Sequence, residues 1–122
     1  MKITLSSLPK LWIFDMDGTL VVHNGYRQGG DRLLDGVREV FARIAPEDHI
    51  LILTAREEAY RDSTEEFLRG HGIRFDVLLC GMPLGERILV NDNKPSGLKM
   101  AFAIDKKRDA ALDIQIIVDK TL

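Results

Sequence analysis

The chain has 122 residues, of which 17 are Lys or Arg and 19 are Asp or Glu, giving a formal net charge of -2 with 45% hydrophobic residues. This balance suits one globular domain over residues 1–122 and provides no broad basic face for nucleic acid. No apolar run approaches the ~20 residues needed to span a bilayer. Met1 to Leu5 does not begin a signal peptide, and Cys80 is the only cysteine, so we expect a cytoplasmic protein without disulfides.

The first informative stretch follows a polar lead-in over residues 1–9. Residues 11–14 are apolar and rich in β-formers, and they are followed by Asp15, Asp17, Gly18 and Thr19. The pattern predicts a buried strand that delivers two carboxylates to the carboxyl edge of an open sheet, where α/β proteins place their ligands. Two carboxylates held this close repel each other, and a hard cation such as Mg²⁺ relieves the repulsion.

The stretch Asp15-Met16-Asp17-Gly18-Thr19-Leu20 resembles the first motif of the haloacid dehalogenase (HAD) superfamily, whose members are Mg²⁺-dependent aspartyl phosphotransferases. The resemblance implies that Asp15 is the nucleophile that becomes aspartyl-phosphate and that Asp17 is the general acid and base. It also implies an α/β fold, with a three-layer Rossmann-like sheet of mostly parallel strands. The chain leaves no room for a cap domain.

Residues 21–30 contain three glycines and have the composition of a loop. In the HAD superfamily this segment forms a flap beside the active site. Substrate contact and a solvated loop are equally good interpretations of its polar residues, which are His23, Asn24, Tyr26 and Arg27.

Two helices and two strands are expected next. Apolar spacing predicts a helix over residues 31–45 with Asp31 as its N-cap, and residues 49–53 form a continuous apolar run typical of a parallel strand. An amphipathic helix over residues 57–70 and a strand over residues 75–80 follow. Cys80 is expected to be a buried small side chain.

Thr54 directly follows the strand expected over residues 49–53. It stands at the position where the second HAD motif has a hydroxyl side chain. The resemblance implies that Thr54, with Ala55 and Arg56 at the following helix start, binds the phosphoryl oxygens. An N-cap is the structural alternative for Thr54, and a surface position is the alternative for Arg56.

Residues 81–86 are too few for a helical crossover, so an extended loop is expected before an apolar strand over residues 87–90. Asn91-Asp92 after that strand resembles the fourth HAD motif, which implies that Asp92 binds Mg²⁺ with Asp15 and the backbone carbonyl of Asp17. Further along, the sequence favours a strand over residues 100–104, a solvated charged turn over residues 105–109 and a last edge strand over residues 114–118.

The sequence departs from the third HAD motif. Met82 stands where many relatives have a lysine that neutralises the charge of the phosphate. Lys94 is the first candidate to replace that lysine, because it follows Asp92 at the same expected sheet edge, and Arg87 is the second. A solvated turn is the alternative for Lys94.

Together the motifs imply a Mg²⁺-dependent phosphatase that hydrolyses a small phosphorylated substrate, such as a sugar phosphate or a phosphorylated acid. Without a cap, the site would be open to large substrates or covered by a neighbouring subunit in a homo-oligomer. Met82 and Asn91 leave a catalytically impaired binding or regulatory domain as an alternative. A phosphotransferase that uses an alcohol as acceptor is another.

Overall fold

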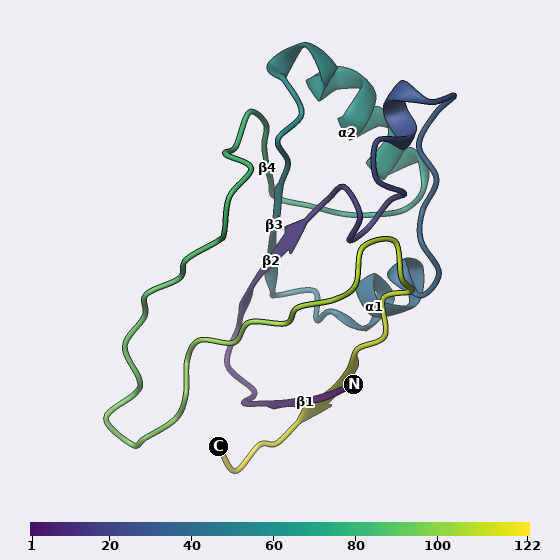
Figure 1. The fold of residues 1–122 in the computed structure, drawn as a ribbon. Coiled ribbons are helices and arrows are strands. Elements are labelled where there is room, and N and C mark those ends of the chain that lie inside the picture. The colour runs from purple at the N-terminus through teal and green to yellow at the C-terminus, as the bar shows by residue number, and fades with distance from the viewer.

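The structure is a computed structural model that describes all residues, 1–122, as a small α/β protein with two parallel sheets and two helices. The central sheet has the order β2-β3-β4, formed by β2 (Leu11–Asp15), β3 (His49–Leu53) and β4 (Val77–Leu79). A second sheet pairs β1 (Lys2–Leu5) with β5 (Gln115–Val118), close to both ends of the chain (Figure 1). No helix has the length and apolar character that a transmembrane span requires.

The strands of the central sheet lie where the apolar runs predicted them. The parallel register pairs Leu11 with His49 and Asp15 with Leu53, so β2 and β3 end together. Strand β4 is shorter than the predicted strand over residues 75–80, and its Leu79 pairs with Leu53. The carboxyl ends of three parallel strands therefore meet at one edge, which positions the residues that follow them.

Only one face of the central sheet is fully covered. Both helices, α1 (Val37–Arg43) and α2 (Arg61–Gly70), lie on the same side of this sheet in Figure 1. The covered face is buried, whereas the other face carries exposed apolar side chains, among them Leu11, Ile13 and Val77. The expected single sheet between two helical layers is thus not formed: the strands divide into two sheets, and no helix covers the second face.

Helix α1 begins at Val37, and its N-cap residue is Gly36, five residues after the predicted N-cap Asp31. Gly36 has φ 84°, and a Cβ added there would lie 2.1 Å from the carbonyl oxygen of Leu112. The backbone at residue 36 therefore needs glycine both for its left-handed conformation and for the close approach of the late chain. Asp31 is left free for a different partner.

The 3₁₀ helix η2 (Glu58–Tyr60) leads directly into α2, in agreement with the predicted helix over residues 57–70. Helix α2 buries Thr64 and Leu68. Residues 1–9 were expected to be a lead-in to the first strand, and this was wrong, because residues 2–5 themselves form β1, which pairs with β5 from the far end of the chain. The last strand was predicted correctly in place.

Residues 80–114 contain no helix or strand, so the strands expected over residues 87–90 and 100–104 are not formed. Within this stretch, residues 83–97 are all exposed, and we call them the outer segment. Ile88 is 86% exposed and Val90 is 89% exposed, so these β-branched side chains lack the neighbours that make a strand favourable. Figure 1 shows the outer segment extending away from the sheet.

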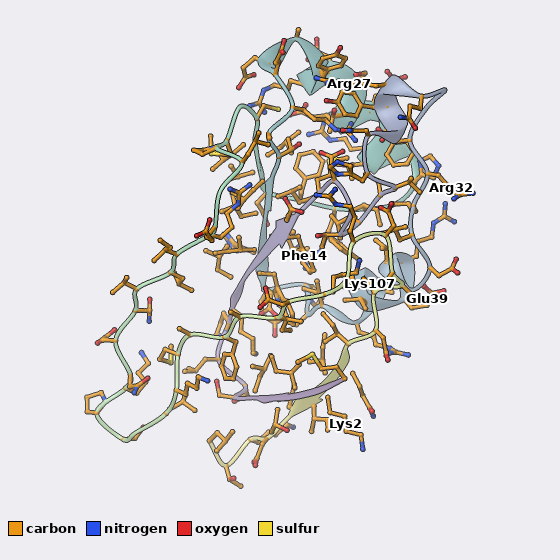
Figure 2. All side chains as sticks on the ribbon, viewed as in Figure 1. Lys2, Phe14, Arg27, Arg32, Glu39 and Lys107 are labelled. Carbon is orange, nitrogen blue, oxygen red and sulfur yellow. The ribbon has the colours of Figure 1, made fainter.

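The core lies between the covered face of the central sheet and the helices. It is one cluster of 17 buried residues that includes Phe14, Met16, Ile52 and Val37, and it extends to Leu112 of the late chain. Figure 2 shows side chains crowded around Phe14, while those of the outer segment project into open space. The turn after β2 is therefore anchored on the core, whereas the outer segment is not.

Candidate functional site

Asp15 is the last residue of β2, and its side chain is 44% exposed. The preceding Phe14 is buried, so the alternation of the strand turns Asp15 away from the core. The Oγ1 of Thr19 donates a hydrogen bond of 2.9 Å to Oδ2 of Asp15. This leaves the Oδ1 of Asp15 without a hydrogen-bond partner at the carboxyl edge of the sheet.

A tight turn brings Thr19 back to Asp15. The carbonyl of Met16 accepts hydrogen bonds from the amides of Thr19 and Leu20, at 3.1 and 2.8 Å, while the side chain of Met16 is fully buried. Gly18 has φ 84°, a left-handed conformation that glycine adopts at little cost. The turn therefore brings the hydroxyl of Thr19 against the carboxylate of Asp15. The glycine and the threonine at these positions are explained by this local structure alone.

Asp17 is held by hydrogen bonds on both of its oxygens. Its Oδ2 accepts from Oγ1 of Thr54 at 2.9 Å, and its Oδ1 accepts from Nη2 of Arg56 at 2.8 Å. The Nε of Arg56 also donates to the same carboxylate, at 3.2 and 3.3 Å. The geometry fixes the orientation of Asp17 and joins the ends of β2 and β3.

Arg56 is the centre of a buried polar cluster, with its side chain only 1% exposed. Besides Asp17 it binds Asp31, through Nη2–Oδ1 and Nη1–Oδ2 bonds of 2.7 and 2.9 Å, and it donates to Oγ1 of Thr64 at 3.0 Å. The guanidinium carbon also lies 4.0 Å from the ring centre of Tyr26. Every N–H group of this guanidinium is therefore satisfied inside the protein.

The electrostatics of Arg56 follow from this cluster. Burial lowers the pKa of its guanidinium, but hydrogen bonds to Asp31 and Asp17 raise it by more, so the net pKa lies above its ordinary value. Arg56 was predicted to bind phosphate or to lie on the surface. The structure instead places it in the interior, where it has no donor left for a ligand.

An open pocket of about 260 Å³ lies beside Asp15. No hydrophobic side chain lines it; its residues are Asp15, Asp17, Gly18, Thr19, Lys106 and Arg108. The Nζ of Lys106 donates to the carbonyl of Gly18 at 2.9 Å. Burial lowers the pKa of the Lys106 ammonium, while the nearby charges of Asp109 and Asp15 act in the opposite direction.

The structure brings together part of the predicted site. Asp15, Asp17, Thr54 and Arg56 all lie at the carboxyl ends of β2 and β3, and the amide of Ala55, between Thr54 and Arg56, donates no hydrogen bond within the chain. Thr54 also accepts from the amide of Arg56 at 3.1 Å, a bond between residues two apart in the chain. The N-cap alternative for Thr54 was wrong, because the N-cap residues of η2 and α2 are Glu57 and Tyr60.

Asp92 and Lys94 are not brought to this edge. Both lie in the exposed outer segment, and neither lines the pocket. Of the two lysine replacements, Arg87 is the one that lies near Asp15, with Nη2 3.9 Å from Oδ1. Both side chains of this pair are well exposed, so the contact contributes little free energy.

Two cations and one acid near Asp15 and Asp17 were not predicted from the sequence. Lys106 and Arg108 belong to a stretch that was expected to be a solvated turn, and no motif or periodicity in the sequence marks them as pocket residues. Asp31 was expected to be an N-cap and is instead the second carboxylate of the Arg56 cluster. Only the long-range path of the chain could have revealed these contacts.

The carboxylates do not form a complete metal cage. No group of three or more His, Cys, Asp or Glu side chains is placed to share one ion. Asp15 offers one oxygen that no hydrogen bond occupies, whereas both oxygens of Asp17 are bound by Arg56 and Thr54. Mg²⁺ in phosphoryl-transfer sites commonly uses one or two carboxylates together with substrate phosphate and water, so the residues fit an ion shared with a bound phosphate.

Comparison with known proteins returns no match among protein-family models, curated proteins or solved structures.

Proposed function

We propose that the chain is a Mg²⁺-dependent phosphomonoester hydrolase of the HAD type, with Asp15 as nucleophile. The observation that carries the proposal is the exposed, partly unbound carboxylate of Asp15 in an entirely polar pocket that also contains two cationic side chains. A phosphate ester is an anion, so a carboxylate can approach it only where positive charge offsets the repulsion. The resemblance of residues 15–20 to the first HAD motif supports the same assignment.

The proposed reaction has two steps. Oδ1 of Asp15 attacks phosphorus, an O–P bond forms, and the bond from phosphorus to the alcohol oxygen breaks as that oxygen takes a proton from Asp17. Water then attacks the aspartyl-phosphate, gives its proton to Asp17 and releases inorganic phosphate. For this role Asp17 must give up one of its hydrogen bonds to Thr54 or Arg56, since both of its oxygens are occupied.

Mg²⁺ would be held by Asp15 and by oxygens of the bound phosphate, and it would supply positive charge beside the transferring phosphoryl group. Because Oδ1 of Asp15 is the attacking atom, only Oδ2, which also accepts from Thr19, would remain for the ion, so its affinity should depend on the presence of phosphate. The backbone carbonyl of Asp17 and the carboxylate of Asp92 are the other ligands that the HAD resemblance implies.

Hydrolysis of p-nitrophenyl phosphate in the presence of Mg²⁺ tests the proposal. We expect the wild type to release phosphate and Asp15→Asn to be inactive, because an amide is a far weaker nucleophile than a carboxylate. Asp62→Asn is the matched control, since Asp62 is exposed on α2 and outside the pocket. Equal rates for the wild type and Asp15→Asn would reject the enzyme assignment.

A phosphate-binding domain without turnover is the second candidate. It is favoured by the full hydrogen bonding of Asp17 and by the position of Asp92 outside the pocket. Such a domain would bind inorganic phosphate but leave p-nitrophenyl phosphate intact. If hydrolysis does occur, product analysis with added sugar alcohols separates a hydrolase from a phosphotransferase, which would form a new phosphate ester.

A further inference from the structure

Two cations from the late part of the chain reach the pocket beside Asp15. Lys106 and Arg108 lie on a stretch without regular structure, and they line the pocket together with Asp15, Gly18 and Thr19. The amide of Asp109 donates to the carbonyl of Gly18 at 2.9 Å, so this stretch is tied to the turn after β2. The two cations are thus held at the pocket by backbone contact.

Lys106 retains one donor for a ligand. Its ammonium group has three N–H bonds, and two of them are accounted for by the carbonyls of Gly18 and Lys107, at 2.9 and 3.1 Å. These two bonds orient Nζ without neutralising its charge, because carbonyls carry no net charge. The remaining N–H is available to an anion in the pocket.

Arg108 is free at its charged end, and its stem passes close to Gly18. Its guanidinium makes no hydrogen bond or ion pair, since it occurs in no such contact within the chain. Its aliphatic Cγ would lie 3.0 Å from a Cβ added at Gly18, so glycine at this position lets the stem pass over the turn. The whole donor fork of Arg108 is therefore available for an oxyanion.

None of the neighbouring acids forms an ion pair with Lys106 or Arg108. Asp17 is paired with Arg56, and Asp109 uses Oδ1 to accept from the amide of His23 at 2.8 Å. Asp15 has Thr19 on one oxygen and Arg87 3.9 Å from the other. Lys106 and Arg108 therefore bring unpaired cationic donors to the pocket beside Asp15.

We propose that Lys106 and Arg108 bind the phosphoryl oxygens of a phosphate ester beside Asp15, the task for which Lys94 was the first candidate from sequence. The proposal rests on the proposed function for the identity of the ligand. In this proposal both cations contact the substrate directly. They come from residues 105–109, a segment that carries none of the motifs that resemble the HAD superfamily.

The test measures binding of inorganic phosphate by isothermal titration calorimetry. We expect Lys106→Gln and Arg108→Gln each to raise the dissociation constant by about tenfold, because each removes a charge-assisted hydrogen bond. Lys107→Gln is the matched control: it makes the same charge change between the two residues, and Lys107 does not line the pocket. Lys94→Gln should bind phosphate as the wild type does.

Thermal unfolding of each variant accompanies the titrations, because Lys106→Gln also removes the bond to Gly18. Arg108→Gln loses no bond within the chain, so it tests the proposal even if the Lys106 variant is unstable. Absence of saturable phosphate binding, or equal weakening by Lys107→Gln, would overturn the proposal.

Hydrolysis assays separate this inference from the proposed function. If Asp15-dependent hydrolysis occurs and Arg108→Gln keeps the wild-type KM and phosphate affinity, the hydrolase stands and the inference is wrong. If phosphate binding requires Arg108 but p-nitrophenyl phosphate is not hydrolysed, the inference stands and the hydrolase is wrong.

Discussion

Arg56 and Asp17 form an ion pair of 2.8 Å, and the arginine side chain is almost completely buried. Arg56 lies three residues after the end of the central strand β3 at Leu53, and Asp17 lies two residues after the end of β2 at Asp15. The same guanidinium binds Asp31 at 2.7 Å and stacks on Tyr26, so it links the loop over residues 21–30 to the sheet. We interpret Arg56 as the residue that positions Asp17, not as a phosphate ligand.

Removing this guanidinium should strongly destabilise the protein. Arg56→Met leaves the carboxylates of Asp17 and Asp31 without their partner, and breaking a buried pair in this way costs roughly 3–5 kcal/mol. Arg56→Lys keeps the charge but cannot bridge two carboxylates, so we expect it to be destabilised as well. Urea unfolding monitored by the single tryptophan measures the change.

Arg43→Met is the control for this experiment. Arg43 lies in the last turn of α1, is exposed and makes no side-chain hydrogen bond, so its loss should leave stability within about 0.5 kcal/mol of wild type. A similarly small effect of Arg56→Met would show that the buried cluster is not what holds the ends of β2 and β3 together.

Gly36 offers a test of the contact between α1 and the late chain. Gly36→Ala would place a methyl group 2.1 Å from the carbonyl oxygen of Leu112, in a backbone conformation with φ 84°. Gly72→Ala is the matched control, because Gly72 has φ 74° and open space around its Cβ position. Gly72→Ala should cost about 1 kcal/mol from backbone strain alone, and Gly36→Ala should cost clearly more.

Differential scanning calorimetry of both glycine variants gives the comparison. Equal unfolding temperatures would mean that Leu112 does not approach residue 36 as the structure has it. That outcome would also remove one anchor of residues 105–114 and leave the contacts with the carbonyl of Gly18 to hold Lys106 and Arg108.

Elements with local signals could be predicted from sequence. The strand over residues 49–53 was predicted at its observed bounds, and the helix over residues 57–70 closely, because a continuous apolar run and a 3.6-residue period are visible within the segment itself. The meeting of Asp15, Asp17 and Thr54 was also expected, since parallel strands that end together place the following residues at one edge.

Features that depend on a distant partner could not be predicted. Strand β1 forms because it pairs with β5, more than a hundred residues away in the chain. No sequence pattern within residues 1–9 indicates this pairing. Conversely, the apolar run over residues 87–90 has strand-forming residues but no neighbouring strand to pair with, so it does not form a strand. Asp31 was predicted to be an N-cap but binds Arg56 instead. This contact depends on the folded chain and is not indicated by the residues around Asp31.

Cys80 should react slowly with alkylating agents. The thiol is buried, and this burial raises its pKa, so less of it is the reactive thiolate at a given pH. We expect iodoacetamide at pH 8 to modify the folded protein more than about tenfold more slowly than protein unfolded in guanidinium. Mass spectrometry over time measures both rates. Equal rates would place Cys80 at the surface and contradict the observed end of β4.

For Asp92, the HAD resemblance and the structure lead to different expectations about Mg²⁺ binding. The resemblance makes Asp92 a ligand of Mg²⁺, whereas the structure places it in the exposed outer segment, away from the pocket lining. From the structure we expect Asp92→Asn to bind Mg²⁺ as the wild type does, and Asp15→Asn to bind it more weakly. Calorimetric titrations with and without inorganic phosphate make the comparison, since an ion held by one carboxylate should bind more tightly when phosphate is present. If Asp92→Asn abolishes the phosphate-dependent Mg²⁺ binding, then Asp92 completes the metal site, and the outer segment must lie against the edge of the sheet when the ion is bound.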